Sequence, residues 1–512
     1  MKRMYPAVVF DRRERFYGFK PKLMKLTQNN LQVLPPGIPR PSYDRNGNTK
    51  RFIVHMGVGG FHRAHQAFYL DELMNKGLSD WAVCGMGVMN EDEKIYNALR
   101  GQDYLYTLIV RHPDGSVRPQ VIGSIVDYIF VPGNRAAAIE KLADPRTAIV
   151  SLTITEGGYN FDQNGDFIFD NPAVQWDIAH PEAPGTVFGL LAAALRFRRE
   201  RGLPAFTVLS CDNIQHNGDV ARRMLLSFTD AVDKDLSAWI AANVSFPNSM
   251  VDRITPVTTP GDIELLTGKY GIEDAWPVTC EPFVQWVLED DFPGSRPAWE
   301  QAGAQFVRNI EPYEKVKLRL LNAGHSLLGF FGSLLGYRTI DEAVGDPLVQ
   351  KALRVFMDEE ATPTLGNVDG IDLDWYKDNL ILRFGNPNIK DQLSRICSES
   401  SDKLPKFLVP TIREQLAAGG QIKYCAAVVA AWCRTLKLYA EGRYDYPIRD
   451  AILDRLVQAA VATAEKDVPE FLKTAVVFGD LAEQPRFADE FMERLREIRT
   501  AGIKETLLKL TK

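Results

Sequence analysis

The chain has 512 residues, of which 45% are hydrophobic and 25% are charged, and its formal net charge is −6. A chain of this size can bury a large core, so it needs neither disulfides nor a structural metal to fold, and two domains are expected. The negative charge disfavours nucleic acid or an anionic membrane as a partner. The sequence contains no apolar run close to the ~20 residues of a membrane span.

The six cysteines show neither CxxC nor zinc-finger spacing, which favours reduced thiols in the cytoplasm. Residues 1–23 are basic and aromatic and lack the apolar stretch and cleavage site of a signal peptide. We expect them to form an extension that is peripheral to the chemistry. Residues 27–50, rich in Pro, Asn and Gly, are typical of a loop-like lead-in.

The first half of the chain alternates between strand and helix patterns. Residues 52–54 read as a strand, 57–60 as a glycine turn and 64–74 as a helix. Further strands are predicted at 81–88, 106–110, 121–130, 147–155 and 206–211, and helices at 136–144 and around 187–199. This alternation predicts an α/β domain built from βαβ units around a largely parallel sheet.

Helical patterns dominate from about residue 310 to the C-terminus, where Pro312 suits a first helical turn. We therefore predict a Rossmann-type domain over residues 24–309 and a mostly α-helical domain over residues 310–512.

A glycine turn, Gly57-Val58-Gly59-Gly60, joins the first strand to its helix. Such a turn lets backbone N–H groups approach a pyrophosphate at a helix N-terminus. The third glycine of the dinucleotide-binding pattern is replaced by His62. The turn alone therefore fits either a dinucleotide site or a plain strand–helix connection.

Two acids, Glu91 and Asp92, follow the strand at 81–88. An acid in this place binds the adenosine ribose and disfavours the 2′-phosphate of NADP, so the pair indicates NAD. Acids also stabilise the first turn of a helix, which is the alternative explanation.

Lys317, Asn322 and His325 lie in one helical segment. At about 100° per residue, all three fit on one broad helix face. A neutral Lys can accept the proton of an alcohol while amide N–H groups stabilise the alkoxide. Two loops could complete the site: one carries Asn213, and the other carries Asp252 and Arg253. Each of these features also occurs on ordinary protein surfaces.

Several longer segments of the sequence resemble those of a known protein family. They are IVHMGVGGFHRAHQA, SLTITEGGY, SCDNIQHNG, FPNSMVDRITP, WPVTCEPFVQWVLED and the segment from Lys317 to His325. Together they resemble the mannitol dehydrogenase family of long-chain, zinc-independent polyol dehydrogenases, from about Met24 to the C-terminus. The resemblance implies a Rossmann-type domain, a helical domain and an active site between them.

The resemblance also implies roles for individual residues. Lys317 would be the general base, and Asn213 and Asn322 would form the oxyanion site. Glu314 would pass the proton to water. The substrate-binding residues would be Asp252, Arg383 and His325. The cofactor-binding residues would be Gly57, Val58, Gly59, Gly60, Phe61, Glu91, Asp92, Thr155 and Glu156.

The expected reaction is the NAD-dependent interconversion of a linear polyol and a ketose, without a metal. D-mannitol and D-fructose are the favoured pair. D-arabinitol, D-sorbitol and a sugar acid such as fructuronate are the alternatives within the family. Family members are often monomeric, so we expect a monomer that binds small molecules only.

Three other classes of protein compete with this interpretation. The pair Tyr313 and Lys317 fits the YxxxK pattern of short-chain dehydrogenases, although it lies very late in the chain. A zinc-dependent alcohol dehydrogenase requires a ligand set that the sequence does not supply. A non-catalytic sugar-binding or NAD-sensing protein would need the glycine turn, but not a base flanked by amides.

Overall fold

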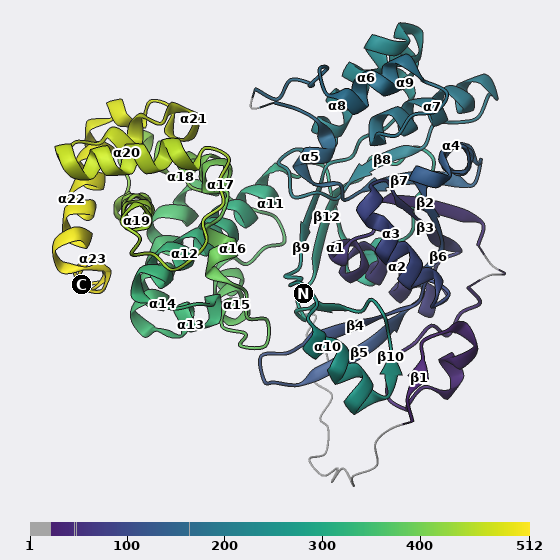
Figure 1. Ribbon diagram of the computed structural model, residues 1–512, viewed down its shortest axis with the longest axis horizontal. Coiled ribbons are helices and arrows are strands. Elements are labelled where there is room, and N and C mark those ends of the chain that lie inside the picture. The colour runs from purple at the N-terminus through teal and green to yellow at the C-terminus, as the bar shows by residue number, and fades with distance from the viewer. Residues whose placement is uncertain (1–21, 46, 48, 163) are drawn as a thin grey trace.

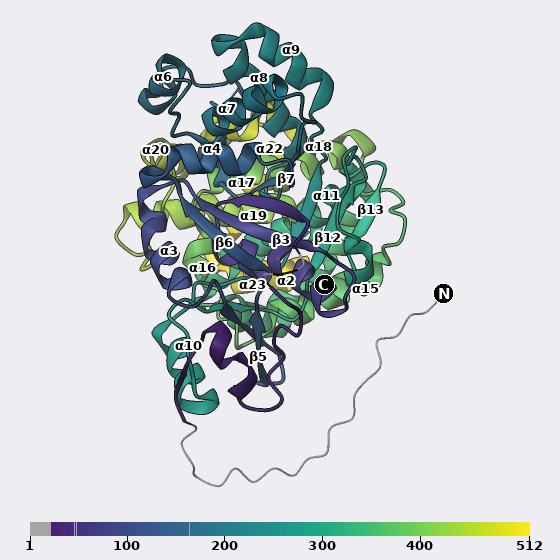
Figure 2. The ribbon, with the colours of Figure 1, turned by 90° about the vertical axis from the view of Figure 1, so that its right-hand side faces the viewer.

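A computed structural model describes residues 22–512 except 46, 48 and 163, so most of the predicted extension 1–23 lies outside the described residues. An N-terminal region contains the sheets, and a C-terminal region is helical (Figure 1). Turned by 90°, the molecule shows the sheets in front of the helical region (Figure 2). The two regions therefore lie side by side. The predicted α/β fold class with a helical C-terminal part is confirmed.

The central sheet has five parallel strands in the order β6-β3-β2-β7-β8. They are β2 (Arg51–Met56), β3 (Trp81–Gly87), β6 (Ile125–Phe130), β7 (Thr147–Leu152) and β8 (Thr207–Ser210). The chain builds the sheet outward from β2 to β6 and then returns to the other side of β2 with β7. The carboxyl ends of β2 and β7 therefore flank the switch point at which doubly wound sheets bind ligands.

Alternating side chains of these strands pack into cores on both faces. Ile53 faces a core with α2 (Gln66–Asn75) and α3 (Glu93–Arg100), which follow the short α1 (Gly60–Ala64). Val54 faces a core with α4 (Arg135–Ala143), α7 (Val187–Glu200) and α8 (Asn217–Val232). Other helices of this region are α5 (Thr155–Tyr159), α6 (Pro172–Ala179), α9 (Lys234–Asn243) and α10 (Pro260–Leu265). Helices cover both faces, as a parallel sheet requires.

The prediction of one strand over residues 121–130 is wrong. The structure has β5 (Val117–Ile122), which pairs antiparallel with β4 (Tyr106–Arg111), and then β6 in the central sheet. The chain changes sheets at Gly123, where a Cβ atom would lie 2.6 Å from Pro41. The strand at 106–110 therefore belongs to a separate sheet, in which β11 (Val278–Cys280) also pairs with β4.

A third sheet carries residues of the site. It consists of β9 (Ser249–Asp252), β12 (Gln285–Glu289) and β13 (Gln305–Val307), with β12 in the middle. A two-residue pairing of β1 (Met24–Lys25) with β10 (Ile272–Glu273) fixes the start of the described chain. Because β9 ends at Asp252, this sheet delivers that carboxylate to the boundary with the helical region.

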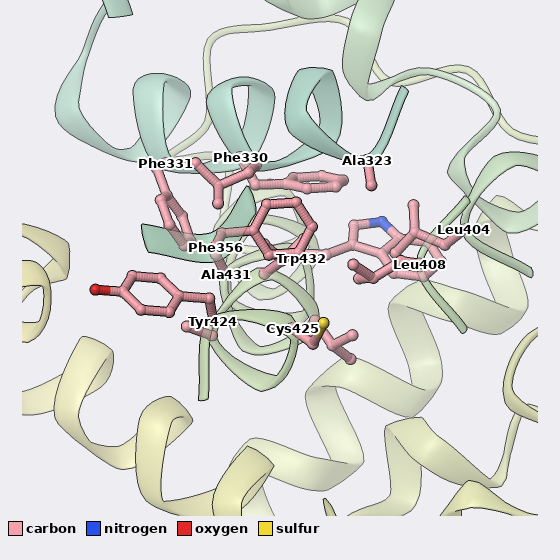
Figure 3. Close-up of a cluster of buried hydrophobic side chains, with 14 of the residues drawn as sticks. Ala323, Phe330, Phe331, Phe356, Leu404, Leu408, Tyr424, Cys425, Ala431 and Trp432 are labelled. Carbon is pink, nitrogen blue, oxygen red and sulfur yellow. The ribbon is translucent and has the colours of Figure 1, made fainter. Parts of the chain in front are cut away.

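The helical region packs around α12 (Ala323–Leu335) and α19 (Lys423–Ala440), whose Phe330 and Trp432 rings lie 6.0 Å apart in its core (Figure 3). Its other helices are α11 (Glu311–Val316), α13 (Ile340–Gly345), α14 (Pro347–Val355), α15 (Leu373–Phe384), α16 (Leu393–Cys397), α17 (Ser400–Phe407), α18 (Val409–Ala418), α20 (Leu453–Lys466), α21 (Ala475–Phe478), α22 (Pro485–Ala501) and α23 (Ile503–Leu510). Among the described helices, none combines the length and apolarity that crossing a membrane requires.

Candidate active site

The glycine turn lies at the switch point, between β2 and α1. Gly57 has φ of +89°, and a Cβ atom there would lie 2.1 Å from the carbonyl oxygen of Thr153 at the end of β7. Only glycine fits this close approach of two strand ends. His62, which replaces the third glycine, is fully buried and stacks on His55 with ring centroids 3.4 Å apart. The side chain at position 62 therefore packs in the protein interior beneath the turn.

A large cavity opens at the turn, with a volume of about 2030 Å³ counted out to the open solvent. Gly57, Glu91, Asp92 and Thr155 line it, together with Val131, Pro132 and Arg135 after β6. Val58 is instead buried in the core beneath the sheet, and Phe61 stacks on His65 beside a separate groove. The cavity thus follows the carboxyl ends of β3, β6, β2 and β7, where an extended dinucleotide binds in this fold.

The two acids after β3 differ in their contacts. Asp92 accepts a hydrogen bond from the Met89 backbone N–H at 3.0 Å and so caps a short 3-10 helix, Asn90–Asp92. Glu91 is exposed on the cavity wall, and within the described residues it makes neither a hydrogen bond nor an ion pair. Glu91 is therefore the acid that is free to bind a ligand.

Asp212, which the sequence reasoning missed, holds the loop after β7. Its carboxylate accepts the backbone N–H groups of Ile154 at 3.0 Å and Thr155 at 2.8 Å. Thr155 has φ of +61°, so these bonds stabilise a backbone conformation that is unusual for threonine. Glu156 pairs with Lys406 of α17 at 2.6 Å, so this loop also contacts the helical region.

Lys317 lies at the boundary between the two regions and is buried. Its Nζ donates to Asn213 Oδ1 at 2.5 Å and to the Val251 carbonyl oxygen at 2.8 Å. Burial lowers the pKa of Lys317 below that of a free lysine, against the opposing charges of Asp252 and Glu314. A lowered pKa is what a lysine needs to act as a proton acceptor near neutral pH.

Two amides accompany this lysine. Asn213 follows β8 and uses its oxygen for Lys317, so its Nδ2 remains available as a donor. The Asn322 side chain is nearly buried and has no hydrogen-bond partner among the described residues. Both amides therefore have donors to offer to an oxyanion.

The segment Lys317–Asn322 is a π-helix, not the regular α-helix that the sequence predicted. A π-helix closes i→i+5 hydrogen bonds, so the assumed 100° per residue does not apply within this segment. Such segments are rare and concentrate at functional sites. The side-chain directions of Lys317 and Asn322 are therefore set by a feature that periodicity does not reveal.

Glu314 extends the cluster toward the surface. Its Oε1 accepts the His216 backbone N–H at 3.0 Å, and its Oε2 lies 3.7 Å from Nδ1 of the same residue. Burial raises the pKa of Glu314, while His216 and Lys317 oppose this shift. The His216 side chain is 42% exposed. Glu314 thus stands between the buried lysine and solvent.

His325, in α12, packs on Phe384 with ring centroids 4.5 Å apart, and its Nε2 has no partner among the described residues. Burial lowers the pKa of His325 to about 4, so the imidazole is neutral at physiological pH. A neutral imidazole can donate to a hydroxyl or accept from one.

Asp252 and Arg383 were both predicted to bind substrate, and the structure joins them to each other. Arg383 donates to both carboxylate oxygens of Asp252, at 2.8 and 2.9 Å, and to both of Glu281, at 2.8 and 3.0 Å. These bonds use four of its five N–H groups, which leaves one for a ligand. Glu281 lies in WPVTCEPFVQWVLED, one of the segments that carry the resemblance, but the sequence analysis gave it no role.

Metal chemistry would need a cluster of donors. In the described part of the chain, no group of three or more His, Cys, Asp or Glu side chains is arranged to hold a metal ion. All six cysteines are buried and free.

Comparison with known proteins identifies the family. The model for the mannitol dehydrogenase Rossmann domain matches residues 51–301, and the model for the C-terminal domain of the same family matches residues 309–499. The chain belongs to the mannitol dehydrogenase family. The resemblance seen in the sequence motifs is thereby confirmed.

Individual relatives cover nearly the whole chain. Mannitol 2-dehydrogenases of Aspergillus terreus and Aspergillus fumigatus are each 44% identical over 95% of this chain and 99% of their own. The Pseudomonas fluorescens mannitol 2-dehydrogenase, solved as a ternary complex with NAD and D-mannitol, is 46% identical, with a TM-score of 0.85 over 95% of this chain and 99% of its own. A D-sorbitol dehydrogenase in substrate-free form is 36% identical, with a TM-score of 0.86 over 94% and 100%.

Proposed function

We propose that the chain is an NAD-dependent polyol dehydrogenase that interconverts D-mannitol and D-fructose. The observation that carries the proposal is the buried Lys317, which Asn213 holds in a small pocket that Asp212 and Glu314 also line. The choice of mannitol rests on the relatives at 44–46% identity that bear this name. D-sorbitol is the second candidate, because the relative of that name has 36% identity and the same fold.

The residues at the switch point fit a dinucleotide. The close approach at Gly57 leaves the start of α1 open to a pyrophosphate, because the first N–H groups of a helix lack intrahelical acceptors. Glu91 would bind the ribose hydroxyls, and Thr155 would line the nicotinamide end. Bound there, NAD would supply the acceptor for the hydride of the carbinol carbon.

The chain's own residues handle the proton. Neutral Lys317 accepts the hydroxyl proton of the polyol, and the amides of Asn213 and Asn322 donate to the oxygen as negative charge develops there. Glu314, next to His216, relays the proton between the lysine and solvent. His325 and the remaining N–H of Arg383 bind other hydroxyls of the polyol, and Asp252 orients Arg383.

The other classes of enzyme fit less well. The Tyr313 hydroxyl donates to the Asp369 carbonyl oxygen at 2.8 Å, so it is engaged away from Lys317 and does not form the pair of a short-chain dehydrogenase. A zinc enzyme would need a ligand cluster, which the described residues do not form. The cytoplasmic compartment and the monomeric state stay predictions, to be checked by fractionation and sedimentation.

The test is a spectrophotometric screen of NAD and NADP with mannitol, sorbitol, arabinitol, fructose and fructuronate. We expect mannitol with NAD to give the highest kcat/KM. Lys317→Ala should lower kcat by at least about a hundredfold, the usual share of a general base. The variant should also lose the acid limb of the pH profile, and a small primary amine should partly restore the rate. A variant that keeps both rate and pH dependence would refute the assignment of the base.

A further inference from the structure

A buried group of three charges joins the two regions beside Lys317. Arg383 lies on α15 of the helical region, whereas its partners lie in the N-terminal region: Asp252 ends β9 and Glu281 follows β11. The three residues are 6%, 4% and 1% exposed, in that order. Arg383 also lies over the Phe283 ring, with the guanidinium carbon 3.9 Å from the ring centroid. Solvent therefore screens the charges of this group little.

Glu281 is the most firmly held member of the group. Its Oε1 accepts the Ile254 backbone N–H at 2.6 Å, and its own N–H donates to the Ile254 carbonyl oxygen at 3.0 Å. Its carbonyl oxygen also accepts from Arg253 Nε at 3.1 Å. These bonds tie Glu281 to the chain directly after Asp252. The two carboxylates are therefore presented to Arg383 as a fixed pair.

Glu281 has no hydrogen bond with Lys317 among the described residues, but it shares Arg383 with Asp252. We infer that Glu281 is a positioning residue for the base: by holding half of the Arg383 guanidinium, it sets the place of the Asp252 carboxylate and the positive charge that reaches Lys317. This inference rests on the proposed role of Lys317 as the base.

The charges that face Lys317 determine the direction in which its pKa should shift when Glu281 is replaced. Asp252 from β9 and Glu314 from α11 favour its protonated form, whereas Arg383 from α15 and burial favour the neutral form. His65, before α2, is neutral because burial lowers its pKa to about 3. If Glu281 loses its charge, Arg383 is less neutralised and draws Asp252 more strongly to itself. Both effects lower the pKa of Lys317.

The first experiment measures kcat/KM for polyol oxidation against pH in the Glu281→Gln variant of the full-length enzyme. Oxidation needs neutral Lys317, so a lower pKa moves the acid limb to lower pH. We expect a shift of at least about 0.5 pH unit, at the modest end of what neighbouring charges produce. The control is Glu360→Gln, because Glu360 is equally buried and accepts two backbone N–H groups, but lies within the helical region. Its acid limb should stay in place.

A second variant should shift the acid limb in the opposite direction. Replacing both partners, Glu281→Gln with Arg383→Met, removes the positive charge and leaves Lys317 as the cationic neighbour of Asp252. The acid limb should then move to higher pH. This second variant also keeps the test decisive if Glu281→Gln alone does not fold, because the one carboxylate that it leaves, Asp252, still has the Lys317 cation as a neighbour. A merely loosened site would not give shifts of opposite sign.

The outcomes separate this inference from the proposed function. If Lys317→Ala abolishes the acid limb but neither Glu281 variant moves it, Glu281 does not act on the base and only the inference is wrong. Shifts of the same sign in both variants overturn it as well. If Lys317→Ala keeps the acid limb, the proposed base itself is wrong.

Discussion

Glu91 and Asp92 are adjacent in the sequence, but the structure separates their tasks. The sequence predicted an acidic pair at the adenosine end of the cofactor site and left helix capping as the alternative. Asp92 makes the capping bond to Met89, whereas Glu91 is free on the cavity wall. The type and place of these residues could be predicted from the sequence. Which carboxylate is already engaged could not, because that depends on local backbone geometry.

This difference predicts which acid governs cofactor preference. Glu91→Arg should raise the ratio of kcat/KM for NADP to that for NAD at least about tenfold, because it removes a repulsion and adds a cation that can pair with the 2′-phosphate. Asp92→Asn, which keeps an oxygen for the Met89 N–H, should change the ratio much less. Initial-rate kinetics with both cofactors measure the two ratios. An equal effect of the two substitutions would contradict the assignment of Glu91.

At the scale of elements, periodicity and turn residues predicted the strands of the central sheet and the strand–turn–helix unit at Gly57. These patterns failed where contacts with other elements determine the local structure. Residues 121–130 read as one strand, but they form two strands of different sheets, joined at Gly123. The segment from Lys317 reads as a regular helix, but it contains a π-helical turn. A regular hydrophobic period in the sequence does not show where a strand is interrupted or where a helix takes in the extra residue of a π-helical turn.

The π-helical turn predicts the effect of a deletion. Removing Leu318 should allow a regular α-helix, which rotates Asn322 and His325 by about 100° relative to Lys317. We expect kcat to fall at least about a hundredfold, because the base and the oxyanion donor no longer face one substrate. Circular dichroism and NADH binding should show that the fold remains.

The matched control is deletion of Thr267 from the π-helix Leu266–Tyr270, which lies in the N-terminal region outside the site. A folded variant of this kind should keep its turnover. A Leu318 deletion with unchanged kcat would show that the π-helical turn is not needed for the reaction.

For the whole molecule, the change from alternating strands and helices to helices alone predicted the two-part architecture. The contacts that join the two parts could not be predicted from the sequence, because Arg383 lies 131 residues from Asp252 and 102 residues from Glu281. Another bridge, between Glu156 and Lys406, joins the same two regions, but its side chains are 44% and 42% exposed. These two bridges should differ in what they contribute to stability.

Arg383→Met should lower the free energy of unfolding by roughly 3–5 kcal/mol, because it leaves two buried carboxylates without their cation. Lys406→Met should change it by no more than about 1 kcal/mol, because solvent screens an exposed ion pair. Urea unfolding, followed by tryptophan fluorescence and by far-UV circular dichroism, measures both effects. Since Arg383 also joins the two regions, its loss should separate the transitions seen by the two probes, whereas Lys406→Met should leave them coincident. Equal small losses in both variants, with coincident transitions, would mean that the buried charge group does not hold the two regions together. The site around Lys317 would then depend on other contacts for its geometry.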